Sequence, residues 1–242
     1  MLSKEFHIDT TATKEELRKV LEEYQPWRMG VSFSNGLNTK DFNRMEPFSD
    51  IPLNKLLMIS QHCGEDWLYN KRVLDIGSNI GYNSITLAQQ FGCSVTGLEF
   101  NPGNIEKAKM LAGLSGADLD IDFVEGDAVT FVRHNEYDLI LHLGTLYHLA
   151  DPVNGIFNTA ASLKSGGKLY IETSVYHSDD PNACRFIYGL GGDTTNFWAL
   201  SPFVVEQLVT QGGLKNFEMV RDIKIKLFEG LNMSRAIFAA EK

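Results

Sequence analysis

The chain has 242 residues, of which 43% are hydrophobic and 22% charged, and this composition excludes the disordered and fibrous classes of protein. Its formal net charge of -9 gives no overall attraction to phosphate backbones or to anionic membranes. The first residues lack the apolar core of a secretory signal and no apolar run is long enough to span a bilayer, so we expect a cytoplasmic protein without membrane contact.

The N-terminal region predicts a short amphipathic helix. Thr13 and Glu16 have the spacing of a capping box, the apolar residues that follow share one helical face, and Pro26 ends the pattern. Residues 27–50 have no hydrophobic period, so they form either an ordered loop over a site or a simple connector. A second, apolar helix is expected from Pro52. We assign residues 1–65 to a helical extension or lid.

From Arg72 onward, apolar β-rich runs alternate with helical patterns, which is typical of βαβ units and a parallel sheet. We therefore predict one Rossmann-like α/β domain over residues 66–242, with a mostly parallel seven-stranded sheet and helices on both faces. The predicted strands span residues 72–76, 94–99, 120–124, 137–143, 167–174, 216–223 and 233–241.

Two later segments carry their own predictions. Asp151 and Pro152 begin a helix whose apolar stripe is expected to be core: Val153, Ile156, Phe157, Ala160 and Ala161. Residues 175–200 are too long and Gly-rich for a tight connection, so we expect them to contact a substrate.

The clearest motif follows the first strand of this domain, where Asp75, Gly77 and Gly81 have the spacing D-x-G-x-x-x-G. Glycines permit a tight turn with close backbone approach, and the start of the next helix offers free N–H groups to a polar or anionic ligand. The G-x-G-x-x-G spacing of dinucleotide sites is missing, which disfavours a nicotinamide cofactor.

This passage resembles the first motif of the class I methyltransferases, which bind S-adenosylmethionine. Glu99 ends the next strand, where a carboxylate can accept hydrogen bonds from both ribose hydroxyls. Asp127 follows the third strand, and the resemblance implies that it reads the adenine amino group. Two alternatives stay open: an α/β domain without a nucleotide, and Asp127 as a helix N-cap only.

The fourth strand ends before Tyr147 and His148, at the edge where open α/β sheets bind ligands. His148 has a pKa range suited to taking a proton from a hydroxyl or amine, although it could equally be a capping residue of the loop. His142 lies inside the strand and is expected to be structural. Cys63, Cys93 and Cys184 form no CxxC pair, which argues against a disulfide framework and a zinc site, so we predict no metal.

A narrower resemblance links the chain to the tRNA wobble-uridine carboxymethyltransferases, which use carboxy-S-adenosylmethionine. It rests on Pro26-Trp27-Arg28-Met29-Gly30, Gly144 to His148, Glu172-Thr173, Asn196-Phe197-Trp198, Ser201-Pro202 and Ser234-Arg235-Ala236. The resemblance implies that Tyr147 and Arg235 hold the extra carboxylate, but Met29 replaces the family's lysine and Lys55 matches a second lysine only loosely. The alternative for Arg235 is a surface salt bridge.

We therefore predict S-adenosylmethionine as the cofactor. The predicted cofactor-binding residues are Met29, Asp75, Gly77, Ser78, Asn79, Gly81, Glu99, Phe100, Asp127, Ala128, Leu143 and Tyr147, and the predicted catalytic residues are Tyr147, His148 and Arg235.

Three functions remain open. The first is methyl transfer to a small molecule, which an aromatic set favours: Trp27, Phe33, Phe186, Tyr188, Phe197 and Trp198. The second is tRNA modification, disfavoured by the net charge although a basic patch is available in Arg221, Lys224, Lys226 and Arg235. The third is a non-catalytic protein that binds the cofactor. The sequence does not indicate an oligomeric state.

Overall fold

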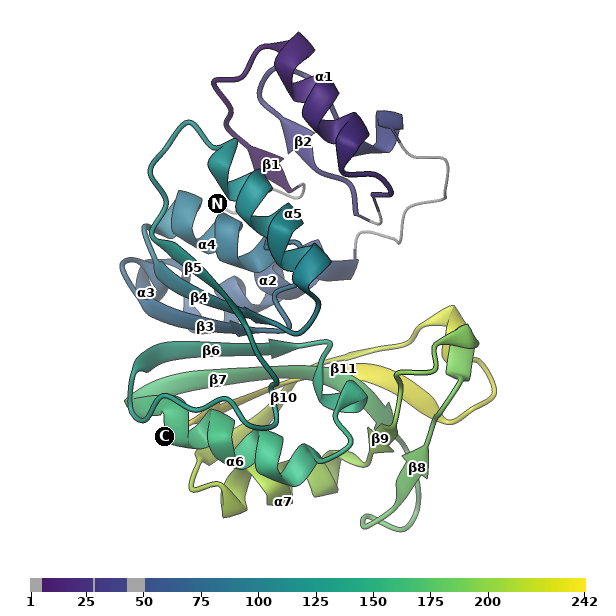
Figure 1. Ribbon diagram of the computed structural model, residues 1–242. Helices are drawn as coiled ribbons and strands as arrows, with labels where there is room; N and C mark the ends of the chain where they lie inside the picture. The colour runs from purple at the N-terminus through teal and green to yellow at the C-terminus, as the bar shows by residue number, and fades with distance from the viewer. Residues whose placement is uncertain (1–5, 28, 43–50) are drawn as a thin grey trace. The chain divides into compact units, whose positions relative to one another are not determined.

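The computed structural model describes residues 6–27, 29–42 and 51–242 (Figure 1). The chain forms two compact units, each made of two stretches of sequence. Unit 1 comprises Met1–Lys71 and Ser78–Glu125, and unit 2 comprises Arg72–Gly77 and Gly126–Lys242. This division differs from the predicted boundary between residues 65 and 66, which stays a prediction.

Unit 1 begins with two short strands around a helix: β1 (His7–Ile8), α1 (Lys14–Glu23) and β2 (Ser32–Phe33), with the two strands parallel. The predicted capping box is present, because the Thr13 hydroxyl accepts from the Glu16 amide while the Glu16 carboxylate accepts from the Thr13 amide. A short 3₁₀ helix, η1 (Thr39–Phe42), follows. Part of the stretch 27–50 is therefore regular structure, and residues 43–50 lie outside the described residues.

The rest of unit 1 is built from helices and two parallel strands. The elements are α2 (Ile51–Cys63), α3 (Glu65–Leu68), α4 (Tyr82–Phe91), β4 (Ser94–Glu99), α5 (Pro102–Gly113) and β5 (Ile121–Glu125). One apolar cluster joins the N-terminal residues to these elements, with Leu17, Leu21 and Trp27 packed together with Ile105 and Phe123. The N-terminal extension is therefore anchored in the core of unit 1.

Unit 2 contains a sheet with the strand order β10-β11-β7-β6-β3. The strands β3 (Arg72–Ile76), β6 (Tyr137–Leu143) and β7 (Leu163–Tyr176) are parallel, whereas β11 (Met233–Glu241) and β10 (Lys215–Ile223) complete it in antiparallel order. Figure 1 shows α6 (Pro152–Ser162) and α7 (Pro202–Gln211) along one face of these strands.

The connections of unit 2 carry short elements. They are η2 (Leu146–His148), β8 (Cys184–Phe186), η3 (Leu190–Gly192), β9 (Trp198–Leu200) and η4 (Lys226–Phe228). β8 and β9 form an antiparallel pair, and β9 also joins the end of β7 through one parallel bridge.

The predicted mostly parallel α/β sheet is confirmed, and every one of the seven predicted strands is present. The short strands β1, β2, β8 and β9 were not predicted, because two or three residues carry no readable alternation. One packing prediction was partly wrong: Ile156 and Ala160 of α6 are buried, but Val153 is 43% exposed and Phe157 39% exposed. No described helix combines the length and the apolar character needed to cross a bilayer.

Candidate active site and cofactor-binding residues

The predicted cofactor motif begins in the core of unit 2. Asp75 is 1% exposed inside β3, and Gly77 follows with a positive φ of 72°. A Cβ at Gly77 would collide with the side chain of Thr145, whose hydroxyl donates to the Ile76 carbonyl at 3.0 Å. Glycine is therefore required here by the backbone conformation and by the close approach of Thr145.

The motif continues in unit 1 with the turn that precedes α4. Asn79 has a φ of 52° and Gly81 a φ of 84°, and a Cβ at Gly81 would press against the ring of Phe123. The Ser78 hydroxyl is buried and has no hydrogen-bond partner among the described residues. α4 then starts without a side-chain cap. A buried hydroxyl without a protein partner suits a polar ligand.

The Glu99 carboxylate is held in place at the end of β4. One oxygen accepts the Asn79 amide and the other accepts the Asn101 amide, each at 2.9 Å. The oxygen bound to Asn101 also accepts from the side-chain amide of Asn104 at 3.4 Å. Because each carboxylate oxygen can accept two hydrogen bonds, the oxygen bound to Asn79 keeps capacity for a ribose hydroxyl. The neighbouring Phe100 is 76% exposed, so its ring is available to cover a ligand. Their binding to the nucleoside part of S-adenosylmethionine stays a prediction.

Asp127 and Ala128 lie in unit 2, directly after β5. Asp127 does not cap a helix: one carboxylate oxygen accepts the Val129 amide at 2.8 Å and closes a turn. The side chain thus makes the same local contact as a helix N-cap, although a turn and not a helix follows it. The side chain is exposed, so its other oxygen remains accessible for an amino group.

The predicted catalytic residues come together in unit 2. The guanidinium carbon of Arg235 lies 4.2 Å from the centre of the Tyr147 ring, and the His148 ring lies 4.1 Å from the same ring. Leu143, at the end of β6, is half-buried on the same segment. The structure thus places the three predicted catalytic side chains in one cluster.

The partner of Arg235 was not predicted from the sequence. The Nε and Nη2 atoms donate to the two oxygens of Glu172 at 2.6 and 2.7 Å. The Glu172 side chain is 0% exposed and that of Arg235 is 14% exposed, so the surface salt-bridge alternative is wrong. The pair arises from the register of β7 and β11, in which Arg235 faces Ser174 and Ile237 faces Glu172. Such diagonal neighbours share one face of a sheet.

Burial and neighbouring charges both shift the pKa values of Arg235 and His148. Burial alone would lower the pKa of Arg235, but the carboxylate of Glu172 and the oxygen of Tyr147 raise it above its ordinary value. Burial lowers the pKa of His148, and the positive charge of Arg235 lowers it further. The hydrogen bond to the Thr195 backbone and the negative charge of Asp193 raise it. Arg235 therefore stays a cation, and burial favours the neutral form of His148.

The segment 175–200 reaches this cluster directly. The Phe197 amide donates to the Tyr147 carbonyl at 2.8 Å, and the His148 Nδ1 atom lies 3.1 Å from the Thr195 carbonyl oxygen. Nothing in the local sequence singled out Thr195 or Asp193, because their role depends on a loop folding back over 47 residues to reach His148.

An exposed aromatic group lies on β8, β9 and the loop between them. Phe186 is 58% exposed and Tyr188 59% exposed, and their rings are nearly parallel with centres 6.1 Å apart. The ring centre of Trp198 lies 5.3 Å from that of Phe186, to which it is paired in register. We call Phe186, Tyr188, Phe197 and Trp198 the aromatic platform.

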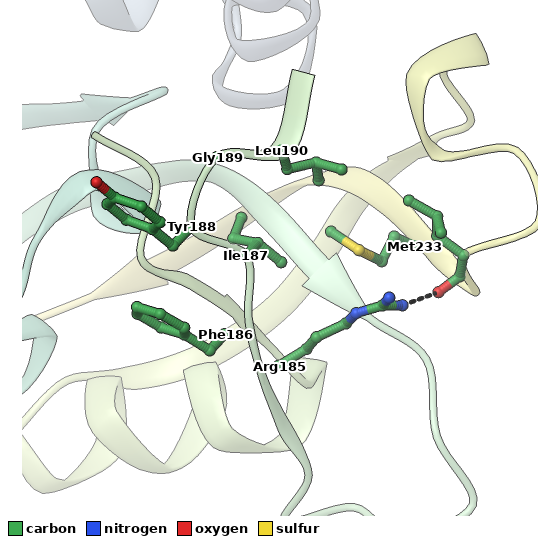
Figure 2. Close-up of a pocket in the computed structure, with 8 residues that line it drawn as sticks. Arg185, Phe186, Ile187, Tyr188, Gly189, Leu190 and Met233 are labelled. Carbon is green, nitrogen blue, oxygen red and sulfur yellow. Dashed lines mark hydrogen bonds between the residues drawn. The ribbon is translucent and has the colours of Figure 1, made fainter. Parts of the chain in front are cut away.

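A pocket of about 220 Å³ adjoins the platform (Figure 2). Figure 2 shows the Phe186 and Tyr188 rings on one side and the Arg185 side chain on the other. The Arg185 guanidinium donates to the Leu231 carbonyl at 2.9 Å. The other lining residues are Ile187, Gly189, Leu190 and Met233.

Two further predictions on aromatic and basic residues need correction. Trp27 and Phe33 are not pocket residues, because they are 1% and 2% exposed in the core of unit 1. Arg235 is not part of an exposed basic patch, because it is paired with Glu172; Arg221 and Lys224 are exposed, and the side chain of Lys226 lies outside the described residues.

Met29 is half-buried against the apolar cluster of unit 1, and Lys55 is buried at 8% exposure. Among the described residues, no group of three or more His, Cys, Asp or Glu side chains is arranged to hold a metal ion.

Comparison with known proteins identifies the family. A family model described as a methyltransferase domain matches residues 55–218. A tRNA U34 carboxymethyltransferase of Desulfotalea psychrophila is 28% identical over 69% of this chain and 50% of its own length. One from Shewanella sp. strain ANA-3 is 25% identical over 78% of this chain and 54% of its own length. The chain thus spans about half the length of the curated relatives it matches.

Solved structures with the same fold include methyltransferases crystallised with their cofactor or its product. The N-terminal domain of EvdMO1, solved in the presence of SAH and D-fucose, has a TM-score of 0.73 at 17% identity, covering 95% of this chain and 97% of that domain. The phosphoethanolamine N-methyltransferase 2 of Haemonchus contortus, in complex with S-adenosyl-L-methionine, has a TM-score of 0.63 at 16% identity, covering 78% of this chain and 52% of that enzyme. The match to the methyltransferase domain over more than half of the sequence, on this fold, shows that the chain belongs to the class I S-adenosylmethionine-dependent methyltransferases.

Proposed function

We propose that this protein transfers a methyl group from S-adenosylmethionine to a hydroxyl group of a small molecule, with His148 as the general base. The observation that carries the proposal is the cluster of Tyr147, His148 and Arg235 beside the aromatic platform. The Phe197 amide bonds to the Tyr147 carbonyl, so the platform and the His148 loop are parts of one connected structure in unit 2.

We assign cofactor binding to the predicted residues of each unit. In unit 1, Glu99 accepts the ribose hydroxyls and Phe100 covers the adenine ring. The buried Ser78 hydroxyl supports a polar ligand at the turn before α4. When bound, S-adenosylmethionine supplies a methyl group that its sulfonium sulfur already activates.

The protein's own residues then have few tasks. Burial lowers the pKa of His148 and so favours its neutral form, which can accept the proton of an acceptor hydroxyl. The exposed rings of Phe186 and Tyr188 offer flat apolar surface to a ring-shaped acceptor. The EvdMO1 domain, which shares the fold over nearly the whole chain, was solved with the sugar D-fucose, and this supports a hydroxylated ring as the acceptor.

The ordinary cofactor is favoured over carboxy-S-adenosylmethionine by the charges at Arg235. Both Nε and Nη2 are bound to Glu172, so the arginine charge is already compensated. An additional carboxylate beside this pair would lose its hydration without gaining a full counter-charge.

A second candidate is tRNA modification, because the curated relatives are tRNA U34 carboxymethyltransferases. The exposed Arg221 and Lys224 and the aromatic platform are the features that suit RNA. The net charge of -9 opposes this reading. Location in the cytoplasm is part of either proposal, and it is supported by Cys63, Cys93 and Cys184, none of which forms a disulfide.

The deciding experiment offers the purified protein both classes of acceptor. Methyl-labelled S-adenosylmethionine is incubated with a panel of sugars and other hydroxylated small molecules, and separately with unmodified tRNA, at low and high salt. We expect label in a small molecule, and loss of that label in the Phe186→Ala variant. Label in tRNA alone would overturn the small-molecule proposal, and tighter binding of carboxy-S-adenosylmethionine in calorimetry would replace methyl transfer by carboxymethyl transfer.

A further inference from the structure

Asp193, Thr195 and His148 form a continuous chain of hydrogen bonds in unit 2. The Oδ1 atom of Asp193 accepts from the Thr195 amide at 2.8 Å and from the Thr195 hydroxyl at 2.6 Å. The Nδ1 atom of His148 lies 3.1 Å from the Thr195 carbonyl oxygen and 3.0 Å from its hydroxyl oxygen. Among the described residues, Nδ1 is the ring nitrogen of His148 that makes hydrogen bonds.

This chain determines which nitrogen of His148 carries the proton. A carbonyl oxygen can only accept, so Nδ1 must donate to Thr195. The Thr195 hydroxyl has one hydrogen, and its short contact with Asp193 uses it, so that oxygen also accepts from Nδ1. Both neighbours of Nδ1 are therefore acceptors, and the lone pair of the neutral ring is left on Nε2.

We propose that Asp193 and Thr195 are positioning residues that hold His148 in the tautomer protonated on Nδ1 and thereby make Nε2 the proton-accepting atom in methyl transfer. The inference rests on the proposed function, in which the acceptor oxygen bonds to the methyl carbon as the methyl–sulfur bond breaks. The hydroxyl proton moves to Nε2, while the proton on Nδ1 stays in its hydrogen bonds to Thr195.

The charges around the ring agree with this role. Asp193 stands at the far end of the hydrogen-bond chain and stabilises the imidazolium that forms, whereas Arg235 disfavours it. The Tyr147 ring packs against His148 with centres 4.1 Å apart and restricts its rotation. Glu172 balances the charge of Arg235, which limits the penalty on protonating His148.

The test is nitrogen-15 NMR of the histidine rings in the full chain, without cofactor or acceptor. The chain has six histidines, and the His148→Gln spectrum assigns the resonances of His148. We expect the wild-type ring to be protonated on Nδ1. In Asp193→Ala the freed Thr195 hydroxyl can donate to Nδ1, so we expect a larger Nε2-protonated fraction and a lower pKa of His148. Adding Thr195→Val removes that donor and should restore the Nδ1-protonated form.

A matched control is available in the same unit. Asp180 makes a turn of the same kind, because its Oδ1 accepts from the Asn182 amide at 2.9 Å, and we expect Asp180→Ala to leave the His148 signals unchanged. A wild-type ring protonated on Nε2, or an Asp193→Ala variant with unchanged tautomer and pKa, would overturn the inference. The wild-type spectrum decides even if a variant does not fold. Absence of methyl transfer by the wild type would count against the proposed function and would leave the tautomer result standing.

Discussion

The buried histidine of β6 makes the stability of this protein depend on pH in a predictable way. His142 is 0% exposed, and neither ring nitrogen has a hydrogen-bond partner among the described residues. Burial lowers its pKa to about 4, against the ordinary value of 6.5. The unfolded chain therefore takes up a proton at this residue before the folded protein does, so the free energy of unfolding decreases as pH falls from about 6.5 to about 4.

The size of the effect follows from these two pKa values. Integrating the proton-binding difference gives a loss of about 2 kcal/mol between pH 7 and pH 5, and about 3 kcal/mol once both states are protonated. We expect the variant His142→Leu to lose about 2 kcal/mol less than the wild type between pH 7 and pH 5, because leucine does not titrate.

The assay is denaturant unfolding of both proteins at pH 7 and pH 5, followed by circular dichroism. The difference between wild type and variant isolates His142 from the other titrating groups. The control is His134→Gln, since the side chain of His134 is exposed and the substitution should leave the wild-type pH dependence intact. If His142→Leu and the wild type lost equal stability on acidification, the ring of His142 would not be buried in its neutral form.

Four further outcomes are expected. Glu99→Ala should weaken S-adenosylmethionine binding by about 1.5–3 kcal/mol in calorimetry through loss of a charged hydrogen-bond acceptor, and unchanged affinity would show that the ribose contact is misassigned. Tyr147→Phe and His148→Ala should lower kcat on the identified acceptor more than they lower cofactor affinity, and wild-type rates in both would make this loop structural. Glu172→Gln should cost about 3–5 kcal/mol of unfolding free energy in chemical denaturation, because its arginine partner keeps a buried charge; a neutral effect would contradict the pairing. Met29→Lys should shift the binding preference toward carboxy-S-adenosylmethionine in competitive titration. An unchanged preference would show that Met29 does not contact the cofactor.

The sequence alone was enough where the deciding interactions are local. The Thr13–Glu16 capping box and the N-cap at Asp151 join residues three positions apart, and the structure contains both. The buried strands were readable because a parallel strand covered on both faces has a continuous apolar run. The motif around Gly77 was readable because a positive φ leaves glycine as the favoured residue.

Contacts between residues that are far apart in the sequence could be identified only from the tertiary structure. Arg235 and Glu172 are 63 residues apart, and only the register of β7 and β11 shows that they neutralise each other. Trp27 and Trp198 were both in the aromatic set that the sequence offered for a small-molecule acceptor. Trp27 is instead buried in the core of unit 1, whereas Trp198 belongs to the aromatic platform. The tautomer of His148 depends on Thr195, which a folded loop brings to it. Hydrophobic periodicity and capping act within a few residues along the chain, whereas charge pairing and ring packing depend on which distant residues the fold brings into contact.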